Sequence, residues 1–166
     1  SNLGFQYGAL VEFFNYGNPS VYPDFLDHTY TEVSRFTKGS GIYRMMYESN
    51  HLIGKTYLCV DLSYLPDKAY DFYGFNGYES VFNKSWMKDL DDGLYKTRMF
   101  YRLERNQFRI KADLQGKISG EHLKWGAGFA FQNFSVGSVD IDRLNKGKDP
   151  DDQLPQVADE PGLYEI

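Results

Sequence analysis

The stretch KTRMFYRLERNQFRIKADLQGKI, residues 96–118, carries the clearest structural pattern in the chain. Read with a period of two, its first part divides into two faces: Thr97, Met99, Tyr101 and Leu103 on one, and Lys96, Arg98, Phe100, Arg102 and Glu104 on the other. After residues 105–106 the alternation resumes, with Phe108, Ile110, Ala112, Leu114 and Ile118 set against Arg109, Lys111, Asp113, Gln115 and Lys117. We therefore predict a β-hairpin that turns at residues 105–106 and has one apolar and one charged face.

The short connections around this hairpin allow its register to be predicted. A turn at residues 105–106 would place Leu103 opposite Phe108 and Tyr101 opposite Ile110. A second turn at residues 120–121 would continue the apolar face onto a third strand. The facing pairs would then be Ile118 with Leu123, Leu114 with Ala127, Ala112 with Phe129, and Ile110 with Phe131.

Composition limits the class of protein. A chain of 166 residues is long enough for one domain with its own core, and an aromatic content of 17% favours strands. The formal net charge of -5 gives no electrostatic reason to expect a nucleic-acid ligand. The single cysteine, Cys59, excludes an intrachain disulfide, and no apolar run approaches the roughly 18 residues of a membrane-spanning helix.

Alternation elsewhere predicts an all-β fold. Strands are expected at residues 4–14, 28–36, 41–49, 55–64 and 122–136, in addition to the hairpin. Together they predict an antiparallel meander of about seven to eight long strands, forming a barrel or partial barrel over residues 1–142. Long connections fall at about 15–27, 65–95 and after 136, and strict up-and-down order cannot place all three on one side of such a barrel.

Two segments depart from this pattern. Phe82, Trp86 and Leu90 are spaced four apart, which predicts a short helix or structured loop near 80–92. Residues 143–166 are rich in acidic residues, lysines and prolines, and are predicted to be a loop or tail.

The orientation of the two faces decides between two kinds of barrel. Long charged side chains lie opposite Gly126, Gly128 and Ala130, which leave room inside a narrow polar lumen. Strands of about 12 residues exceed the globular mode of about 5 to 6 and suit a tilted membrane strand of about 9 to 11. A soluble lipocalin-like barrel that binds a small apolar or sugar ligand would produce the same period with the faces reversed.

The membrane interpretation assigns each face a role. The expected lumen-facing polar residues are Arg98, Arg102, Arg109, Lys111 and Asp113. The expected lipid-facing residues, which would form the core of a soluble barrel, are Tyr101, Phe108, Ile110, Leu114, Leu123, Trp125, Phe129 and Phe131.

Several segments resemble a known family. GFQYGALVEFFNYG, HLIGKTYLCVDLSYL, YDFYGFNGYESVFN, the predicted hairpin and NFSVGSVDIDRLNKGKD are similar to the barrel region of the bacterial surface antigen family, in a form like that of Bacteroides-type bacteria. This family of outer-membrane assembly and translocation proteins includes BamA and TamA. The resemblance spans nearly the whole chain and implies a location in the outer membrane of a Gram-negative bacterium, with a parent protein that helps insert or translocate other outer-membrane proteins. Its partners would be membrane lipid and other outer-membrane proteins, and an isolated fragment could self-associate through open edges.

The sequence offers little support for catalysis, a metal or a cofactor. His28, His51 and His122 lack metal-ligand spacing, and the aspartates at 140, 142, 149, 151 and 152 lack a calcium-loop pattern. Asp61 and Glu104 would form an acid/base pair only if they met, and charge balance within the lumen is the favoured role for both. The aromatic segment 70–78 suits a sugar-stacking platform or, as we prefer, a loop at the membrane interface. We therefore expect a structural, non-enzymatic protein.

Overall fold

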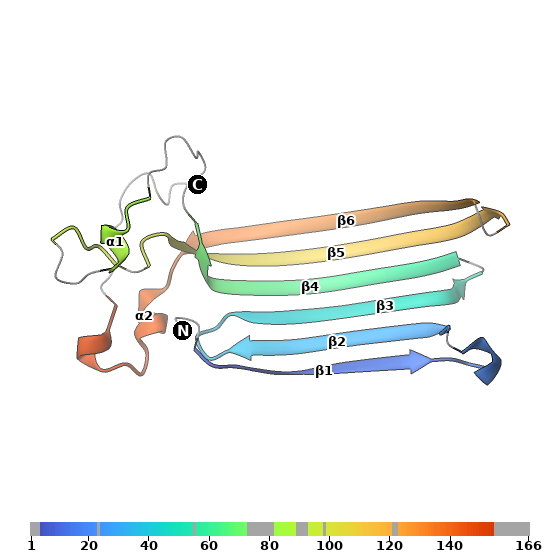
Figure 1. Ribbon diagram of the computed structural model, residues 1–166, viewed down its shortest axis with the longest axis horizontal. Helices are drawn as coiled ribbons and strands as arrows, with labels where there is room; N and C mark the ends of the chain where they lie inside the picture. Colours follow the sequence, from blue (N-terminus) through green and yellow to red (C-terminus); the bar gives the residue numbers. More distant parts are fainter. Residues whose placement is uncertain are drawn as a thin grey trace.

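Six β-strands pair in chain order to form one open antiparallel sheet (Figure 1). The strands are β1 (Gln6–Asn15), β2 (Asp27–Phe36), β3 (Gly41–Ile53), β4 (Thr56–Asp71), β5 (Arg102–Ser119) and β6 (Leu123–Ser138). Short helical segments are α1 (Ser85–Lys88), α2 (Ile141–Asn145), η1 (Pro19–Val21) and η2 (Pro150–Asp152). The computed structural model describes residues 4–154 except 23, 55, 73–81, 89–92, 98 and 121–122.

This architecture confirms the all-β class and the antiparallel meander. It corrects the expected number of strands, because the described residues form six strands rather than seven or eight. In the part of the chain that the structure describes, the sheet does not close on itself, so β1 and β6 each keep one free edge.

The predicted hairpin at residues 96–118 is wrong, because β5 runs without interruption from Arg102 to Ser119. Asn106 pairs with Pro66 on β4 and with Ser135 on β6, so the expected turn lies within a strand that has neighbours on both sides. Leu103 accordingly faces Ser138 rather than Phe108. The alternation changes character near residue 105 because β5 carries polar side chains on both of its faces from Glu104 to Gln107, and not because the chain reverses.

The predicted register between β5 and β6 is confirmed over the middle of both strands. Leu114 faces Ala127, Ala112 faces Phe129 and Ile110 faces Phe131. Near the turn, an irregularity between Lys117 and Ser119 shifts the pairing by one residue, so that Leu123 faces Ser119 and not Ile118.

The two ends of the sheet carry different connections (Figure 1). One end, which we call the short-turn end, has the brief connections 54–55 and 120–122 together with the longer segment 16–26. The other end has the connection 37–40, the long connection 72–101, and α2 after β6. The expectation that the long connections cannot all lie on one side holds, because 16–26 lies at the short-turn end, whereas 72–101 and the chain after β6 lie at the other end.

A small core lies beyond the sheet at the end that carries α2. Met99, Ile141, Leu144 and Leu154 are buried together, with Val139 packed against them. The described part of the predicted tail, residues 143–154, is therefore folded against the connection that precedes β5. The predicted helix near 80–92 is confirmed only as the four residues of α1, whose Trp86 ring packs edge-on against Phe100 at 4.9 Å between ring centroids.

Candidate functional site

The strand pairing sorts the side chains of the sheet into two faces, which we call the polar face and the apolar face. The polar face carries Glu12, His28, Tyr30, Glu32, Arg44, Glu48, Tyr57, Asp61, Arg109, Lys111, Asp113 and Gln115. The apolar face carries Tyr7, Val11, Phe13, Val33, Tyr43, Met45, Leu62, Tyr64, Phe108, Ile110, Leu114, Leu123, Trp125, Phe129 and Phe131.

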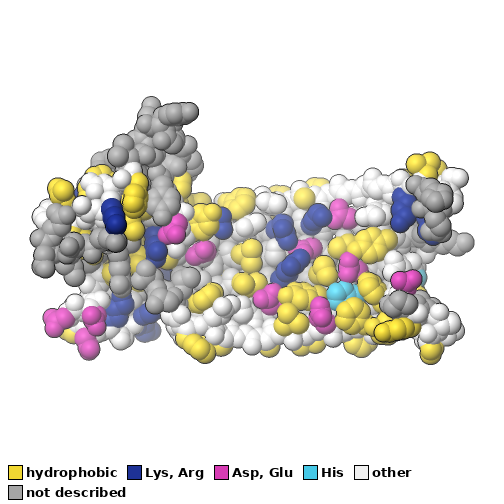
Figure 2. All heavy atoms as spheres, in the orientation of Figure 1, with side chains coloured by type: hydrophobic (Ala, Val, Ile, Leu, Met, Phe, Trp, Pro, Cys, Tyr) yellow, Lys and Arg dark blue, Asp and Glu magenta, His cyan; other side chains and the backbone are white. Residues whose placement is uncertain are grey.

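The exposure of the two faces is the reverse of that in a water-soluble sheet protein. On the polar face Asp61 and His28 are only 5% and 7% exposed, whereas on the apolar face Val11 and Phe129 are 65% and 63% exposed. Figure 2 shows acidic and basic side chains gathered over the middle of the sheet. The most buried charged groups therefore lie at the centre of the polar face, while most of the exposed large hydrophobic groups of the strands lie on the apolar face.

The centre of the polar face is an ion-paired cluster that spans three strands. Asp61 on β4 accepts a hydrogen bond from Arg44 Nε on β3 at 3.0 Å and another from Arg109 on β5 at 2.9 Å. The Arg44 guanidinium also lies 5.7 Å from the centroid of the Tyr30 ring on β2. Because a buried carboxylate requires such partners, this cluster favours one register for β3, β4 and β5.

A second cluster lies near the short-turn end of the polar face. The His28 ring stacks on Phe14 with 4.3 Å between ring centroids, and its Nδ1 lies 2.8 Å from a Glu48 carboxylate oxygen. Glu48 also accepts a hydrogen bond from the hydroxyl of Tyr57, and the other His28 nitrogen lies 3.6 Å from Glu12. These contacts tie β1 through β4 together. Sequence reasoning favoured charge balance for Asp61, with Arg109 among its partners, but it missed Arg44 and the whole histidine cluster, although alternation along residues 28–36 and 41–49 signals a shared polar face.

The structure brings together three of the five polar residues assigned to the lumen. Arg109, Lys111 and Asp113 occupy alternate positions of β5 on the polar face, and Lys111 pairs with Asp113 at 2.8 Å. Arg102 lies seven positions from Arg109 on the same strand, so alternation places it on the opposite face, where it bonds Asp71 at 2.9 Å. Arg98 lies outside the described residues.

Seven of the eight predicted apolar residues share the apolar face, and Tyr101 is the exception. Tyr101 precedes β5 and is only 4% exposed. Its hydroxyl accepts a hydrogen bond from the backbone N–H of Asn83 at 2.9 Å, and its ring stacks on Trp86. The prediction that Tyr101 shares the apolar face with Phe108 depended on the hairpin, and it is therefore also wrong.

The carboxylates considered for acid/base chemistry do not meet. Asp61 is opposite Lys111, which is seven positions from Glu104 on β5, a separation of about 23 Å at about 3.3 Å per residue. Glu104 bonds Lys68 at 3.0 Å and Arg143 at 2.7 Å, which attaches α2 to the sheet. Each carboxylate is thus engaged in its own ion-paired cluster.

Other sequence candidates are not assembled into a site. The residues that the structure describes contain no group of three or more His, Cys, Asp or Glu side chains placed to hold a metal ion. Asp140 instead caps α2 by accepting a hydrogen bond from the backbone N–H of Arg143 at 2.9 Å. His122 and most of the aromatic segment 70–78 lie outside the described residues.

The fold and site define a class: an open antiparallel sheet with an ion-paired polar face and an exposed apolar face. None of the helices in the described part of the chain has the length and apolar character needed to cross a membrane. Comparison of the chain with protein-family models, curated proteins and solved structures gave no match.

Proposed function

We propose that this chain forms part of the wall of an outer-membrane β-barrel, with the polar face lining the lumen and the apolar face contacting lipid. The observation that carries the proposal is the reversed exposure of the two faces, with Asp61 5% exposed and Phe129 63% exposed. Apolar surface that stays in water lacks the stabilisation of about 25 cal/mol per Å² that removal from water provides. Contact with hydrocarbon supplies that stabilisation. Alternation of apolar-out and polar-in residues is the pattern of membrane barrels.

The spacing of aromatic residues on the apolar face supports this orientation. Trp125 faces Gly116 on β5, and Tyr64 faces Phe108 on the same strand. The eight residue steps from position 108 to position 116 span about 27 Å along the strand, and about 20 Å along the membrane normal if the strand is tilted by about 40°. Membrane barrels have an apolar band about 25 Å tall between two aromatic girdles. The separation of about 20 Å between the two aromatic positions of this sheet is close to that height.

The connections suggest which end would face which compartment. Outer-membrane barrels have short periplasmic turns and longer extracellular loops. We therefore place the short-turn end on the periplasmic side, and the connection 72–101 and α2 on the outer side. With 16 to 18 residues, β4, β5 and β6 exceed the roughly 9 to 11 that span a bilayer, so they would project beyond it.

The soluble alternative receives less support. A lipocalin-like barrel would crowd its apolar side chains around a ligand and expose its charged ones. In this sheet Val11 is 65% exposed, while Asp61 is held between two arginines. An apolar or sugar ligand would meet ion pairs on the more enclosed face.

The proposed role of the parent protein, insertion or translocation of other outer-membrane proteins, rests on the sequence resemblance. The role is structural, with lipid and other outer-membrane proteins as partners. It is tested by depleting the parent protein in its own bacterium and quantifying the other barrel proteins in the outer-membrane fraction. We expect their levels to fall, and unchanged levels would contradict the role.

The orientation of the faces is tested with two neighbouring reporter positions. Phe131 and Gln132 lie next to each other on β6 but on opposite faces. In a background without the native tryptophans (Trp86→Phe and Trp125→Phe), we would compare the variants Phe131→Trp and Gln132→Trp in detergent. Each variant would be quenched by acrylamide from water and by a detergent with brominated chains.

We expect brominated chains to quench the Phe131→Trp variant strongly and the Gln132→Trp variant weakly, because only position 131 would contact the detergent. Acrylamide should show the opposite order. Equal quenching at both positions, or preferential quenching of the Gln132→Trp variant by brominated chains, would refute the proposed orientation. Far-ultraviolet circular dichroism of both variants would establish that they keep the same sheet content.

A further inference from the structure

The two edge strands of the sheet each carry a single charged residue. In β1 this residue is Glu12, and in β6 it is Lys124. Glu12 lies on the polar face, because it is opposite Tyr30. Lys124 lies on the same face, because it is two positions from Gly126, which is opposite Gln115. The free edges therefore carry opposite charges on one face of the sheet.

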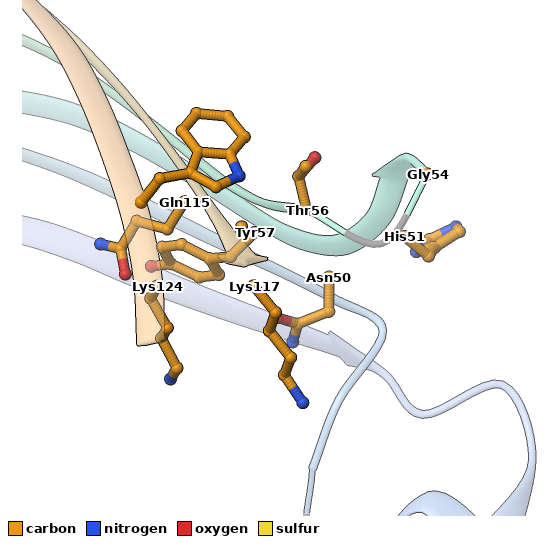
Figure 3. Close-up of a pocket in the computed structure, with 10 residues that line it drawn as sticks. Asn50, His51, Gly54, Thr56, Tyr57, Gln115, Lys117 and Lys124 are labelled. Atoms are coloured by element: carbon orange, nitrogen blue, oxygen red, sulfur yellow. The ribbon is translucent and has the colours of Figure 1, made fainter. Parts of the chain in front are cut away.

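Both charges are accessible to a partner. Lys124 is exposed and lines a pocket of about 740 Å³ at the short-turn end, and Figure 3 shows its side chain extending from the beginning of β6. None of the described residues that line this pocket is acidic. The Glu12 carboxylate lies 3.6 Å from His28 Nε2, and the Glu12 side chain is 44% exposed. A strand that brought a carboxylate to the β6 edge would supply a charge that the pocket lacks.

Pairing of Glu12 with Lys124 between two copies of the chain would fix one register. Because β1 and β6 contain no other charged residue, every other register leaves both charges opposite uncharged residues. The same register places apolar side chains opposite one another: Val11 with Trp125, Ala9 with Ala127, and Tyr7 with Phe129. Leu10 would face Gly126, where the nearest neighbours of an added Cβ atom are 3.7 Å away, so its side chain has room.

This register also satisfies the geometry of a closed barrel. Facing residues lead straight across the sheet, one strand at a time, through Val11, Thr31, Met45, Leu62, Ile110 and Phe131. Phe131 would then face Phe5 of the second copy, which is a shift of six positions from Val11. Two copies give a total shift of twelve positions over twelve strands. An eight-stranded barrel with a shift of eight has the same ratio and a strand tilt of about 36°, within the usual range of about 35 to 45°.

We propose that β6 of one copy pairs with β1 of a second copy at two equivalent junctions, so that two copies close a twelve-stranded barrel. The inference rests on the proposed function, and it identifies the remainder of the barrel wall as a second copy of this chain. Because the sheet has six strands, each junction is antiparallel and both short-turn ends lie on the same side of the membrane. Head-to-tail interfaces of this kind close into a ring. Pairing of β1 with β1 would place the two short-turn ends on opposite sides.

The junction is tested by disulfide trapping between two chains that each carry one cysteine. Both chains carry Cys59→Ser, which removes the single native cysteine. One chain carries Ala9→Cys and the other carries Ala127→Cys. The chains would be mixed in urea, refolded together in detergent and oxidised. Facing residues of an antiparallel pair have Cα atoms about 4.5 to 5.5 Å apart, which a disulfide can bridge.

We expect a covalent dimer that contains both chains and disappears on reduction. The matched control replaces the Ala127→Cys chain by a Phe131→Cys chain, whose cysteine would lie about 13 Å from the facing position. Equal trapping of the two mixtures, or no trapping of either, would overturn the proposed junction. Predominant trapping of the Ala9→Cys chain with itself would overturn the head-to-tail arrangement. An internal disulfide in a monomer that carries both Ala9→Cys and Ala127→Cys would show that one copy closes on itself, which also overturns the proposal.

Charge reversal tests the ion pair at the junction. Lys124→Glu and Glu12→Lys should each weaken dimerisation in detergent by about tenfold, because the pair occurs twice in the ring, and a chain that carries both substitutions should dimerise like the parent chain. Gln132→Glu is the matched control, since it adds a negative charge to the same face of β6 away from Glu12. Sedimentation equilibrium measures the dimerisation. Equal weakening by Gln132→Glu, or no recovery in the double variant, would contradict the ion pair.

A folding defect is distinguished from a weakened junction by circular dichroism. Glu12 lies near His28, so Glu12→Lys has the greater chance of losing the sheet. Lys124→Gln and Lys124→Arg provide a test that does not depend on it. Lys124→Gln should weaken dimerisation, whereas Lys124→Arg should preserve it, and equal dimerisation of these two variants would overturn the role of the charge.

The remaining outcomes separate this inference from the proposed function. Brominated-chain quenching that confirms the membrane orientation, in a chain that stays monomeric in detergent, would refute the second copy alone. Trapping of Ala9→Cys with Ala127→Cys in a protein whose Phe131→Trp variant is not quenched by brominated chains would support the pairing of β6 with β1 and refute the membrane function.

Discussion

Asp61 connects three strands of the polar face through a single carboxylate. Its two oxygens accept hydrogen bonds from Arg44 and Arg109, which come from the strands on either side of β4. The sequence placed Asp61 and Arg109 on polar faces, and the favoured role for Asp61 was charge balance. It could not show that Arg44 completes the cluster, because pairing between β3 and β4 depends on a register that local alternation does not determine.

Replacing Asp61 by Asn should destabilise the folded sheet. The two guanidinium groups would lose their shared counter-charge, and breaking a buried ion pair costs about 3 to 5 kcal/mol. Because the Arg44 and Arg109 side chains are 39% and 31% exposed, solvent reduces the expected loss to about 2 kcal/mol. Urea unfolding in detergent, followed by circular dichroism, measures the change.

Asp113→Asn is the matched control for this prediction. Asp113 pairs with Lys111, whose side chain is 50% exposed, so solvent screens the pair and the loss should be much smaller than for Asp61→Asn. Equal destabilisation by the two substitutions would show that Asp61 has no special role in holding the strands.

At the scale of the strands, the sequence predicted β6, its register with β5 and the division into two faces. These features follow from alternation and from the short connection after Ser119, both of which are local. The prediction of a hairpin at residues 105–106 was wrong. Glu104 and Asn106 interrupt the apolar alternation because the side chain of Glu104 makes contacts with distant parts of the chain, and not because the chain turns there. Glu104 pairs with Lys68 on β4 and with Arg143 on α2, and neither partner is close to it in sequence.

Two glycines on the polar face of the edge strands should respond differently to alanine. A Cβ atom at Gly8 would lie 2.4 Å from the Ser34 Cβ atom and 2.5 Å from the Val33 carbonyl oxygen. A Cβ atom at Gly126 would have its nearest neighbours at 3.7 Å. Gly8→Ala should therefore destabilise the sheet by about 2 kcal/mol through overpacking, whereas Gly126→Ala should be neutral or stabilising by up to about 1 kcal/mol.

The same urea titration measures both glycine variants. Hydrogen exchange should also show weaker protection of β1 in Gly8→Ala, with β5 unchanged. If Gly126→Ala proved the more damaging substitution, the close approach of β1 to β2 would be disproved.

The small core beyond the sheet should unfold independently of the sheet. Leu144 is 2% exposed and packs with Met99, Ile141 and Leu154. Leu144→Ala should cost about 2 to 4 kcal/mol locally and release α2, because the cavity falls in a small cluster beyond the strands. Hydrogen exchange should show lost protection at residues 141–145 while the middle of β5 stays protected. Loss of protection in both would mean that α2 and the sheet unfold as one unit.

The molecule as a whole leaves two kinds of surface open to association. The free edges of β1 and β6 present unpaired backbone groups, and the apolar face presents side chains such as Val11 and Phe129. The sequence predicted the exposed side chains through their alternation. It could not predict an open sheet of six strands, because closure depends on long-range pairing.

Removal of detergent should therefore drive the chain to associate. Light scattering coupled to size exclusion should show a single species in detergent and larger assemblies in water. A Val11→Ser and Phe129→Ser double variant should associate less, whereas Gln132→Ser, which changes the polar face, should behave like the parent chain. A stable, detergent-free monomer would contradict the membrane assignment of the apolar face.

The even number of strands has a consequence for how such a barrel could change in size. β1 begins and β6 ends at the same end of the sheet (Figure 1). A barrel that gained or lost these six strands as a unit would keep every other loop on its original side of the membrane. The sheet therefore has the topology of an exchangeable module, one that can be duplicated or removed without inverting what surrounds it.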